Sequence, residues 1–370
     1  MRIENFKIED WMNKYESSAK YDLSGTCIKP LSINELLNLC EIKDITPVLE
    51  RSLDYGDIKG SDRLKNAIKS LYENQENENI IVTHGAIGAN QLVFLSLLQS
   101  QDEVISVLPV YQQHYSIPEA CGANVKKVFL KEENDWVLDI EDLKKVISSK
   151  TKLICLNNPN NPTGALISDD KMLEIVELAK QNDAWVLCDE VYRGLNFSDK
   201  KYSLSVADVY DKGISVGSMS KTYSLPGLRV GWICANNDFI EEVVHHREYN
   251  TISVSILDEY FAAIALENKD KISERNFEIL NESKSVLEDW LRENKNLSCV
   301  LPHAGTTVFL KYNKDISSED FCRKLQEETG VALLPGKALE LDGYVRLGFC
   351  NSHDVLKIAL EKISDFIAKL

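Results

Sequence analysis

Long apolar runs are missing from this sequence of 370 residues. A membrane-spanning helix needs about 20 consecutive apolar residues, and no stretch here approaches that length. At the start of the chain, MRIENFKIEDWMNKYE, charged residues interrupt the apolar ones every two or three positions. That pattern excludes the apolar core of a secretion signal. Together these absences predict a cytoplasmic protein that does not associate with membranes.

A surplus of basic residues is also missing. The chain has 42 Lys and Arg against 58 Asp and Glu, which gives a formal net charge of −16. Such an acidic excess repels phosphate backbones and anionic lipid headgroups, and no local basic patch offsets it. We therefore expect neither nucleic acid nor a membrane surface among the partners.

The nine cysteines include no CxxC pair. Paired cysteines at that spacing are what zinc chelation or dithiol chemistry requires. We expect nine reduced thiols and no metal site.

What the sequence does contain is a regular alternation of apolar runs and helical patterns between about residues 60 and 235. The runs, rich in Val, Ile and Leu, span 79–83, 103–109, 124–130, 152–157, 184–190, 213–218 and 229–234. The clearest helical patterns between them span 61–72, 87–98, 140–147 and 168–181. Continuous apolar strands bounded by helices indicate a mainly parallel sheet that is covered on both faces. This part of the chain is predicted to be an α/β domain.

After residue 236 the pattern changes to long helical stretches. These span 238–249, 255–267 and 270–293. Short strand candidates follow at 308–311, 331–334 and 344–349, and an amphipathic helix begins at residue 353. This arrangement predicts a smaller α+β unit.

The segment SMSKTYSLPGLRVGW, 218–232, follows an apolar strand and carries the most informative residues. Lys221, among small hydroxyl residues, could form a Schiff base with a carbonyl group. Ser218 and Arg229 could hold a phosphate through a hydroxyl and a bidentate guanidinium. An isolated SxSK is more often an exposed loop lysine, so this segment needs support from others.

Three further segments place polar residues directly after predicted strands. In LNNPNNPTG, 156–164, the prolines and the glycine end the strand and direct an Asn amide above the sheet, although a plain turn has the same composition. In AWVLCDEVYRGLNF, 184–197, a buried Asp189 carboxylate would need a cation or a hydrogen-bond donor beside it, and the Tyr192 phenol is a donor nearby. The alternative role for Asp189 is that of a helix cap. In VTHGAIGANQLVFLSLL, 82–98, small residues let the N–H groups at a helix start approach a phosphate, without a GxGxxG or Walker pattern.

In their order and spacing, these segments resemble the fold type I pyridoxal 5'-phosphate (PLP) enzymes of the class I/II aminotransferase superfamily. The resemblance runs from about Tyr55 to Arg346. It implies an α/β large domain, with a mainly parallel seven-stranded sheet between helices, over residues 36–265. It also implies a small domain built from residues 1–35 and 266–370. The implied cofactor is PLP, which carries the chemistry while the protein supplies anchors and electrostatics.

The resemblance implies a catalytic set of Lys221, Asp189 and Tyr192. Lys221 matches the lysine that forms the Schiff base with the cofactor and shuttles a proton at the substrate α-carbon. Asp189 matches the carboxylate that keeps the pyridine nitrogen protonated. Asn161 and Tyr192 match the pair that hydrogen-bonds the phenolic oxygen of the ring and tunes the pKa of the Schiff base.

For the cofactor phosphate, the resemblance implies the backbone N–H groups of Ala86 and Ile87 together with the side chains of Ser218 and Arg229. Tyr55, in DYGDIKG, resembles a tyrosine that reaches the phosphate of the neighbouring subunit. A homodimer with sites at its interface follows from that match.

Tyr111 and Arg346 complete the implied site. Tyr111, in LPVYQQHY, falls where the family places an aromatic ring stacked on the cofactor, although a core or surface tyrosine is the alternative. Arg346, in YVRLGF, matches the arginine that clamps the substrate α-carboxylate, with Asn161 beside it.

The reaction type stays open. The N-terminal segment lacks the Gly-x-Pro-type loop of many class I enzymes, but residues 22–29 are still expected to line the site. Its DWxxxY framework is similar to the capreomycidine synthase-like members, which act on an arginine derivative by elimination and ring closure. An aminotransferase that exchanges an amino group between an L-amino acid and a 2-oxo acid comes first, since that is the commonest activity of the superfamily. The alternatives are a PLP-dependent lyase, cyclase or oxidase and, least favoured because Lys221 is present, a non-catalytic PLP-binding protein. Glu16, Asp22 or Asp57 could select a basic substrate.

Overall fold

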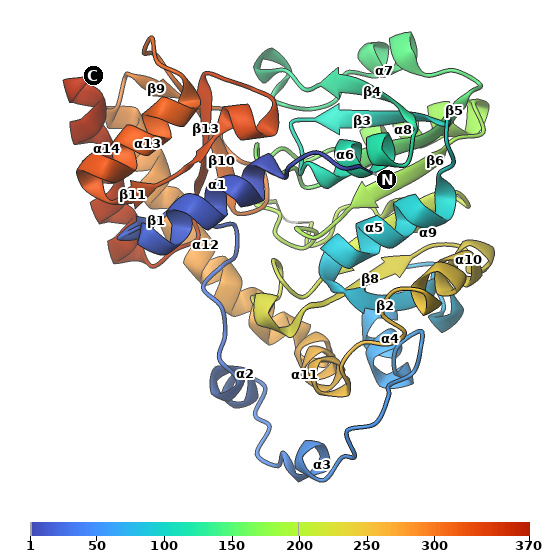
Figure 1. Ribbon diagram of the computed structural model, residues 1–370. Coiled ribbons are helices and arrows are strands. Elements are labelled where there is room, and N and C mark those ends of the chain that lie inside the picture. Colours follow the sequence, from blue (N-terminus) through green and yellow to red (C-terminus); the bar gives the residue numbers. More distant parts are fainter. Residues whose placement is uncertain (1, 199) are drawn as a thin grey trace.

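The computed structural model describes residues 2–198 and 200–370 of the chain. Figure 1 shows two units side by side: a large sheet wrapped by helices, and a smaller unit formed mainly by the C-terminal part of the chain. Within the described residues, no helix combines the length and the apolar character that crossing a bilayer requires. All nine cysteines are free thiols.

The large unit is built on a seven-stranded sheet with the order β2-β8-β7-β6-β5-β3-β4. The strands are β2 (Ile80–His84), β3 (Glu103–Leu108), β4 (Asn124–Phe129), β5 (Thr151–Asn157), β6 (Trp185–Asp189), β7 (Gly213–Ser218) and β8 (Val230–Cys234). β8 is antiparallel to both of its neighbours, and the other six strands run in one direction. The prediction of a mainly parallel seven-stranded sheet is confirmed.

Both faces of this sheet are covered, which explains why its strands are apolar throughout. In β5, Leu153 and Cys155 pack on one face with α5 (Gly85–Leu97) and α10 (Asn237–Glu248), whereas Ile154 and Leu156 pack on the other with α8 (Asp169–Gln181). The remaining helices of this unit are α4 (Asp62–Lys69), α6 (Gln113–Ala120), α7 (Ile140–Val146), α9 (Val206–Val209) and α11 (Ile256–Glu267). The two-residue alternation of a strand thus places its side chains in two separate cores.

The carboxyl ends of the parallel strands meet at one edge of the sheet. Asn157 at the end of β5 lies beside Asp189 at the end of β6. Ser218 at the end of β7 pairs with Gly231, near the start of the reversed strand β8. This edge is where open α/β sheets bind ligands, and it gathers the segments singled out in the sequence.

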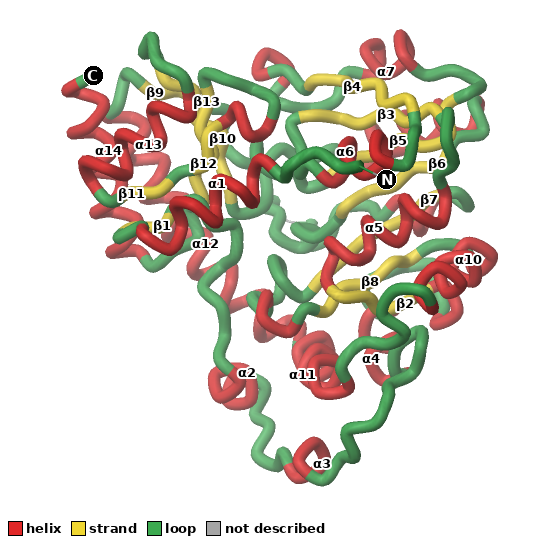
Figure 2. The backbone as a smooth tube through the Cα atoms, in the orientation of Figure 1, coloured by secondary structure: helices red, strands yellow, loops and turns green. Residues whose placement is uncertain are grey.

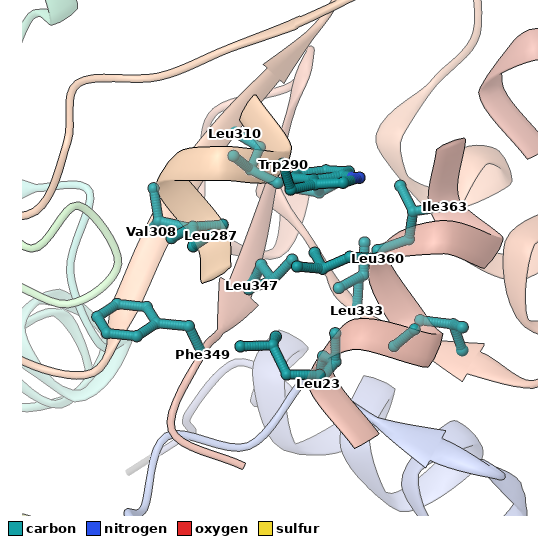
Figure 3. Close-up of a cluster of buried hydrophobic side chains, with 14 of the residues drawn as sticks. Leu23, Leu287, Trp290, Val308, Leu310, Leu333, Leu347, Phe349, Leu360 and Ile363 are labelled. Carbon is teal, nitrogen blue, oxygen red and sulfur yellow. The ribbon is translucent and has the colours of Figure 1, made fainter. Parts of the chain in front are cut away.

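The small unit contains a four-stranded antiparallel sheet with the order β12-β13-β10-β9. Its elements are β9 (Leu297–Ser298), β10 (Thr307–Tyr312), β12 (Leu334–Pro335), β13 (Tyr344–Gly348), α12 (Lys269–Glu293), α13 (Ser318–Thr329) and α14 (His353–Lys369). Figure 3 shows their common core, where Leu287 of α12, Leu347 of β13 and Leu360 of α14 pack around one another. The strand predicted at 331–334 is divided between β11 (Val331–Ala332) and β12.

The N-terminal segment joins the two units. Its strand β1 (Tyr21–Asp22) pairs with β11, and Leu23 enters the core of the small unit. Helix α1 (Lys7–Tyr15), which the sequence analysis did not predict, lies against the small unit in Figure 1, and the residues before it extend to the large unit. The helices α2 (Ile33–Leu39) and α3 (Thr46–Leu49) lie on an extended arm that Figure 2 shows projecting from the body. The domain division at residues 35 and 265 stays a prediction.

Candidate active site

A cavity of about 500 Å³ lies at the carboxyl edge of the large sheet, a volume typical of small-molecule sites. Its walls come from the strand ends, from β13 and from the N-terminal segment. Ten predicted site residues line it: Ala86, Ile87, Tyr111, Asn161, Asp189, Tyr192, Ser218, Lys221, Arg229 and Arg346. Residues separated by up to 260 positions in the chain therefore face one common space.

Lys221 lies in the loop after β7, with its amine inside the cavity. Its Nζ donates to Thr26 Oγ1 at 2.6 Å and to Cys27 Sγ at 3.2 Å. Removal from solvent lowers the pKa of this amine, but Tyr192 and Cys27 outweigh that effect, so the pKa of Lys221 lies above its ordinary value. Of residues 22–29, which were expected to line the site, Gly25, Thr26 and Cys27 line the cavity.

Asp189 is the last residue of β6 and is buried. Its Oδ2 accepts a hydrogen bond from Asn90 Nδ2 at 2.9 Å and lies 3.7 Å from Nε2 of His114. Its Oδ1 accepts from the backbone N–H of Val191 at 3.2 Å in a local turn. The next helix in the described chain begins at Val206, so Asp189 is not the helix cap that the sequence allowed. A buried carboxylate held from three sides is a fixed counter-charge for a cationic group in the cavity. The sequence analysis missed Asn90 and His114.

Asn161 is held in place by the end of β5. Its backbone N–H donates to Asn157 Oδ1 at 2.7 Å, and Asn157 Nδ2 donates in turn to the backbone oxygen of Asp189 at 2.8 Å. Tyr192 follows β6 and is almost fully buried, and burial raises the pKa of its phenol. Both side chains therefore present fixed polar groups to the cavity.

The start of α5 lines the cavity together with Ser218 and Arg229. The first N–H groups of a helix have no partner within the helix and lie at the positive end of its dipole, and Ala86 and Ile87 occupy these positions. Strand β8 can lie close to the start of α5 because Gly231 has no side chain. A Cβ on Gly231 would lie 2.4 Å from the carbonyl carbon of Gly85. This arrangement suits a phosphate group.

Arg346 of β13 is 3% exposed, and its guanidinium faces the cavity. Nη1 donates to Asn161 Oδ1 at 3.1 Å and Nη2 to the backbone oxygen of Ser24 at 2.7 Å. Within the described residues Nε has no hydrogen-bond partner and the guanidinium forms no ion pair. Burial lowers the pKa of this group. A buried cation in that state can accept a carboxylate ligand.

Helix α1 and the short 3-10 turn that follows it (Glu16–Ser18) close one side of the cavity with Ile8, Glu9, Met12 and Glu16. Glu9 Oε1 accepts a hydrogen bond from the Tyr111 hydroxyl at 2.6 Å. Of these four residues, the sequence analysis named Glu16 alone. The spacing of Ile8, Met12 and Tyr15 along KIEDWMNKY would have indicated the helix.

Tyr55 does not line this cavity. It lies between α3 and α4 and is 81% exposed. Its predicted contact with the phosphate of a neighbouring subunit stays a prediction.

Comparison with known proteins decides the family. The family model for aminotransferase class I and II matches residues 36–363, most of the chain. The chain belongs to this family. Its members are PLP-dependent enzymes, and the predicted cofactor and enzyme class are thereby confirmed.

The proteins to which this chain is similar carry the names of different reactions. Capreomycidine synthase of Streptomyces vinaceus is 30% identical over 366 residues, covering 97% of this chain and 92% of that enzyme. An aspartate aminotransferase of Thermotoga maritima is 30% identical over 340 residues, covering 87% of each chain. The crystal structure of a PLP-dependent aminotransferase from Streptococcus suis superimposes with a TM-score of 0.96 at 42% identity, covering 100% of this chain and 99% of that one. These matches support the family but leave the reaction open.

The cavity of this family member fits PLP. The start of α5 and Arg229 suit the phosphate, and the buried carboxylate of Asp189 suits a protonated ring nitrogen. Lys221 places a primary amine in the same space. When bound, PLP supplies an electron-accepting ring for the electron pair that is released when a bond at the substrate α-carbon breaks.

Proposed function

We propose that this chain is an aminotransferase that moves an amino group between an L-amino acid and a 2-oxo acid. The observation that carries the proposal is the shared cavity of Lys221, Asp189 and Arg346. An amine, a buried carboxylate and a buried guanidinium with a free Nε are the groups that this reaction needs. The full-length similarity to a protein described as an aminotransferase supports amino transfer as the outcome.

In this proposal, some cavity residues hold or move protons and others orient the cofactor ring. Lys221 Nζ carries the proton to and from the substrate α-carbon, and the neighbours that raise its pKa favour its protonated form. Asp189 holds the proton on the ring nitrogen, supported by Asn90. Tyr192 and Asn161 orient the oxygen on the ring.

The remaining cavity residues bind the cofactor and the substrate. Ser218, Arg229 and the N–H groups of Ala86 and Ile87 hold the phosphate, because they combine positive charge with free donors. Tyr111 packs against the ring. Arg346 takes the substrate carboxylate, for which Asn161 fixes one edge of the guanidinium.

We also propose a homodimer. The projecting arm exposes Leu49, Leu53 and Tyr55, and the loop after α10 exposes Tyr249 and Ile252. Exposed apolar groups gathered on an extended arm favour a second copy of the chain as their partner. Tyr55 would then contact the phosphate site of the neighbouring subunit. We further propose the cytoplasm as the location of this dimer.

The experiment that tests the proposed reaction is a single-turnover spectrum of the holoenzyme with a panel of L-amino acids, in air and without a 2-oxo acid. Conversion of the cofactor to a stable pyridoxamine form, reversed by adding a 2-oxo acid, is the expected result. Lys221→Ala should abolish this conversion and the lysine adduct that borohydride traps in the wild type. A trapped adduct in the variant would exclude Lys221 as the reactive amine.

The second candidate is a PLP-dependent lyase, cyclase or oxidase acting on an amino acid. The similarity to capreomycidine synthase favours it, because that match extends over 97% of the chain and reaches the N-terminal segment outside the family model. Repeated turnover with release of ammonia or consumption of oxygen, and without pyridoxamine, would select this candidate.

A further inference from the structure

We propose that Glu9 and Glu16 select a substrate with a cationic side chain, either a guanidinium or a primary ammonium. This inference rests on the proposed function, because it names the substrate class of the same cavity. It concerns the end of the amino acid that lies away from the reacting carbon.

The cations of the cavity are already engaged. Lys221, Arg229 and Arg346 line it, and they serve the reacting carbon, the phosphate and the substrate carboxylate in turn. Among the described residues, no further Lys or Arg faces this space. A second carboxylate on the substrate, as in aspartate, would therefore find no counter-charge from this chain.

Negative charge faces the cavity from Glu9 of α1 and from Glu16 directly after it, two exposed residues at its rim. Glu9 uses Oε1 to accept from Tyr111, which leaves Oε2 without a hydrogen-bond partner in the described part of the chain. The Glu16 carboxylate forms neither a hydrogen bond nor an ion pair with any described residue. Partial burial, Asp22 and Glu9 raise the pKa of the Glu16 carboxyl, and Lys221 opposes them in part. A cation bound between Glu9 and Glu16 would relieve the repulsion of their carboxylates.

The spacing of residues along α1 and the turn after it suits a long side chain on the substrate. Positions 9, 12 and 16 follow one another at three and four residues, so Glu9, Met12 and Glu16 share one face of the chain's first helical segment. Ile8 and Met12 add apolar surface beside the two carboxylates. An aliphatic stem that ends in a cation matches this composition.

An independent observation indicates where the other end of the substrate binds. Arg346 is more than nine-tenths buried, lines the cavity and has an unpartnered Nε in the described structure. One cavity thus offers a cation for the α-carboxylate and two carboxylates for the side chain. Its charges are complementary to those of a basic amino acid.

The test compares L-arginine with L-citrulline, which is nearly identical in shape but carries a neutral urea group. For the holoenzyme we expect kcat/KM to be about tenfold or more higher for L-arginine, the size expected for two partly exposed charge pairs. Glu9→Gln and Glu16→Gln should each reduce this ratio, and the double variant should bring it close to one. Asp10→Asn, on the same helix but outside the cavity, is the matched control and should keep the ratio.

A second readout avoids the reaction altogether. Desamino-arginine and desamino-citrulline lack the amino group, so calorimetry on the holoenzyme measures their binding alone. We expect tighter binding of desamino-arginine in the wild type and equal binding of both in the double variant. Equal values for the two amino acids in the wild type, or faster turnover of L-aspartate than of L-arginine, would overturn the inference while leaving the proposed function intact. A holoenzyme whose spectrum responds to no amino acid would instead contradict the proposed function.

Discussion

Single residues decide how closely β8 approaches the start of α5. An added Cβ on Gly231 would lie 2.4 Å from the carbonyl carbon of Gly85 and 2.6 Å from the nitrogen of Ala86. Because both contacts are to backbone atoms, the helix start must move. We expect Gly231→Ala to cost about 1–3 kcal/mol of stability and to weaken PLP binding at least tenfold.

Gly227 provides the matched control, since a Cβ there would meet nothing within 4 Å. Gly227→Ala should leave thermal unfolding and cofactor titration close to those of the wild type. If both alanine variants bound PLP equally well, the position of the α5 start would not matter for the phosphate.

The charge of Asp189 can also be tested by a single substitution. An amide in place of its carboxylate keeps the hydrogen bond from Asn90 but cannot stabilise a proton on the ring nitrogen. We expect Asp189→Asn to bind PLP, as judged by its absorbance, and to lose about a thousandfold in kcat. The exposed Asp170→Asn is the control, and near-normal turnover of Asp189→Asn would rule out the proposed role.

At the scale of the element, α1 forms a wall of the cavity but is anchored outside it. Trp11 Nε1 donates to the backbone oxygen of Leu333 at 3.0 Å, and its ring packs against both neighbouring cores. We expect Trp11→Ala to loosen α1 and to raise KM about tenfold.

Hydrogen exchange followed by mass spectrometry checks this expectation. Amides of residues 7–15 should exchange faster in Trp11→Ala, while those of β5, β6 and β7 keep their wild-type protection. Lys14→Ala on the same helix is the control. Unchanged exchange across α1 would mean that other contacts, such as that of Lys7 with Gln112, are sufficient.

The elements also differ in how far the sequence predicts them. The seven strands could be predicted because strands covered on both faces are apolar throughout, and their ends mark where site residues such as Asp189 and Lys221 lie. The hydrogen-bond partners of those residues could not be predicted. Asn90 contacts Asp189 across 99 positions and Trp11 contacts Leu333 across 322, and no local pattern encodes contacts of that separation. Helix α1 was missed because charged residues mask its apolar spacing.

At the scale of the whole molecule, the proposed dimer makes a prediction about mixed subunits. Tyr55→Ala and Lys221→Ala should each be inactive alone if Tyr55 serves the neighbouring site. In a mixture, one site of each hybrid dimer would combine an intact Lys221 with an intact Tyr55 from the other chain. Activity should return to about a quarter of the wild-type value for random pairing.

Mixing Lys221→Ala with Asp189→Asn is the control, because both of these residues line the cavity of one chain and neither hybrid site would be complete. No activity should return. Failure of the first mixture to recover, with dimers present by analytical ultracentrifugation, would place Tyr55 outside the neighbouring site.

The long helix α12 links both units to the reactive loop. Asn276 donates through Nδ2 to the backbone oxygen of Thr222 at 2.9 Å, directly after Lys221. Farther along the helix, Leu287 and Trp290 lie in the core of the small unit, the unit that carries Arg346. The 25 residues of α12 form a rod of about 37 Å. One continuous helix thus connects the unit that carries Arg346 to the peptide next to Lys221, so the separation between the substrate-carboxylate arginine and the amine depends on where α12 lies.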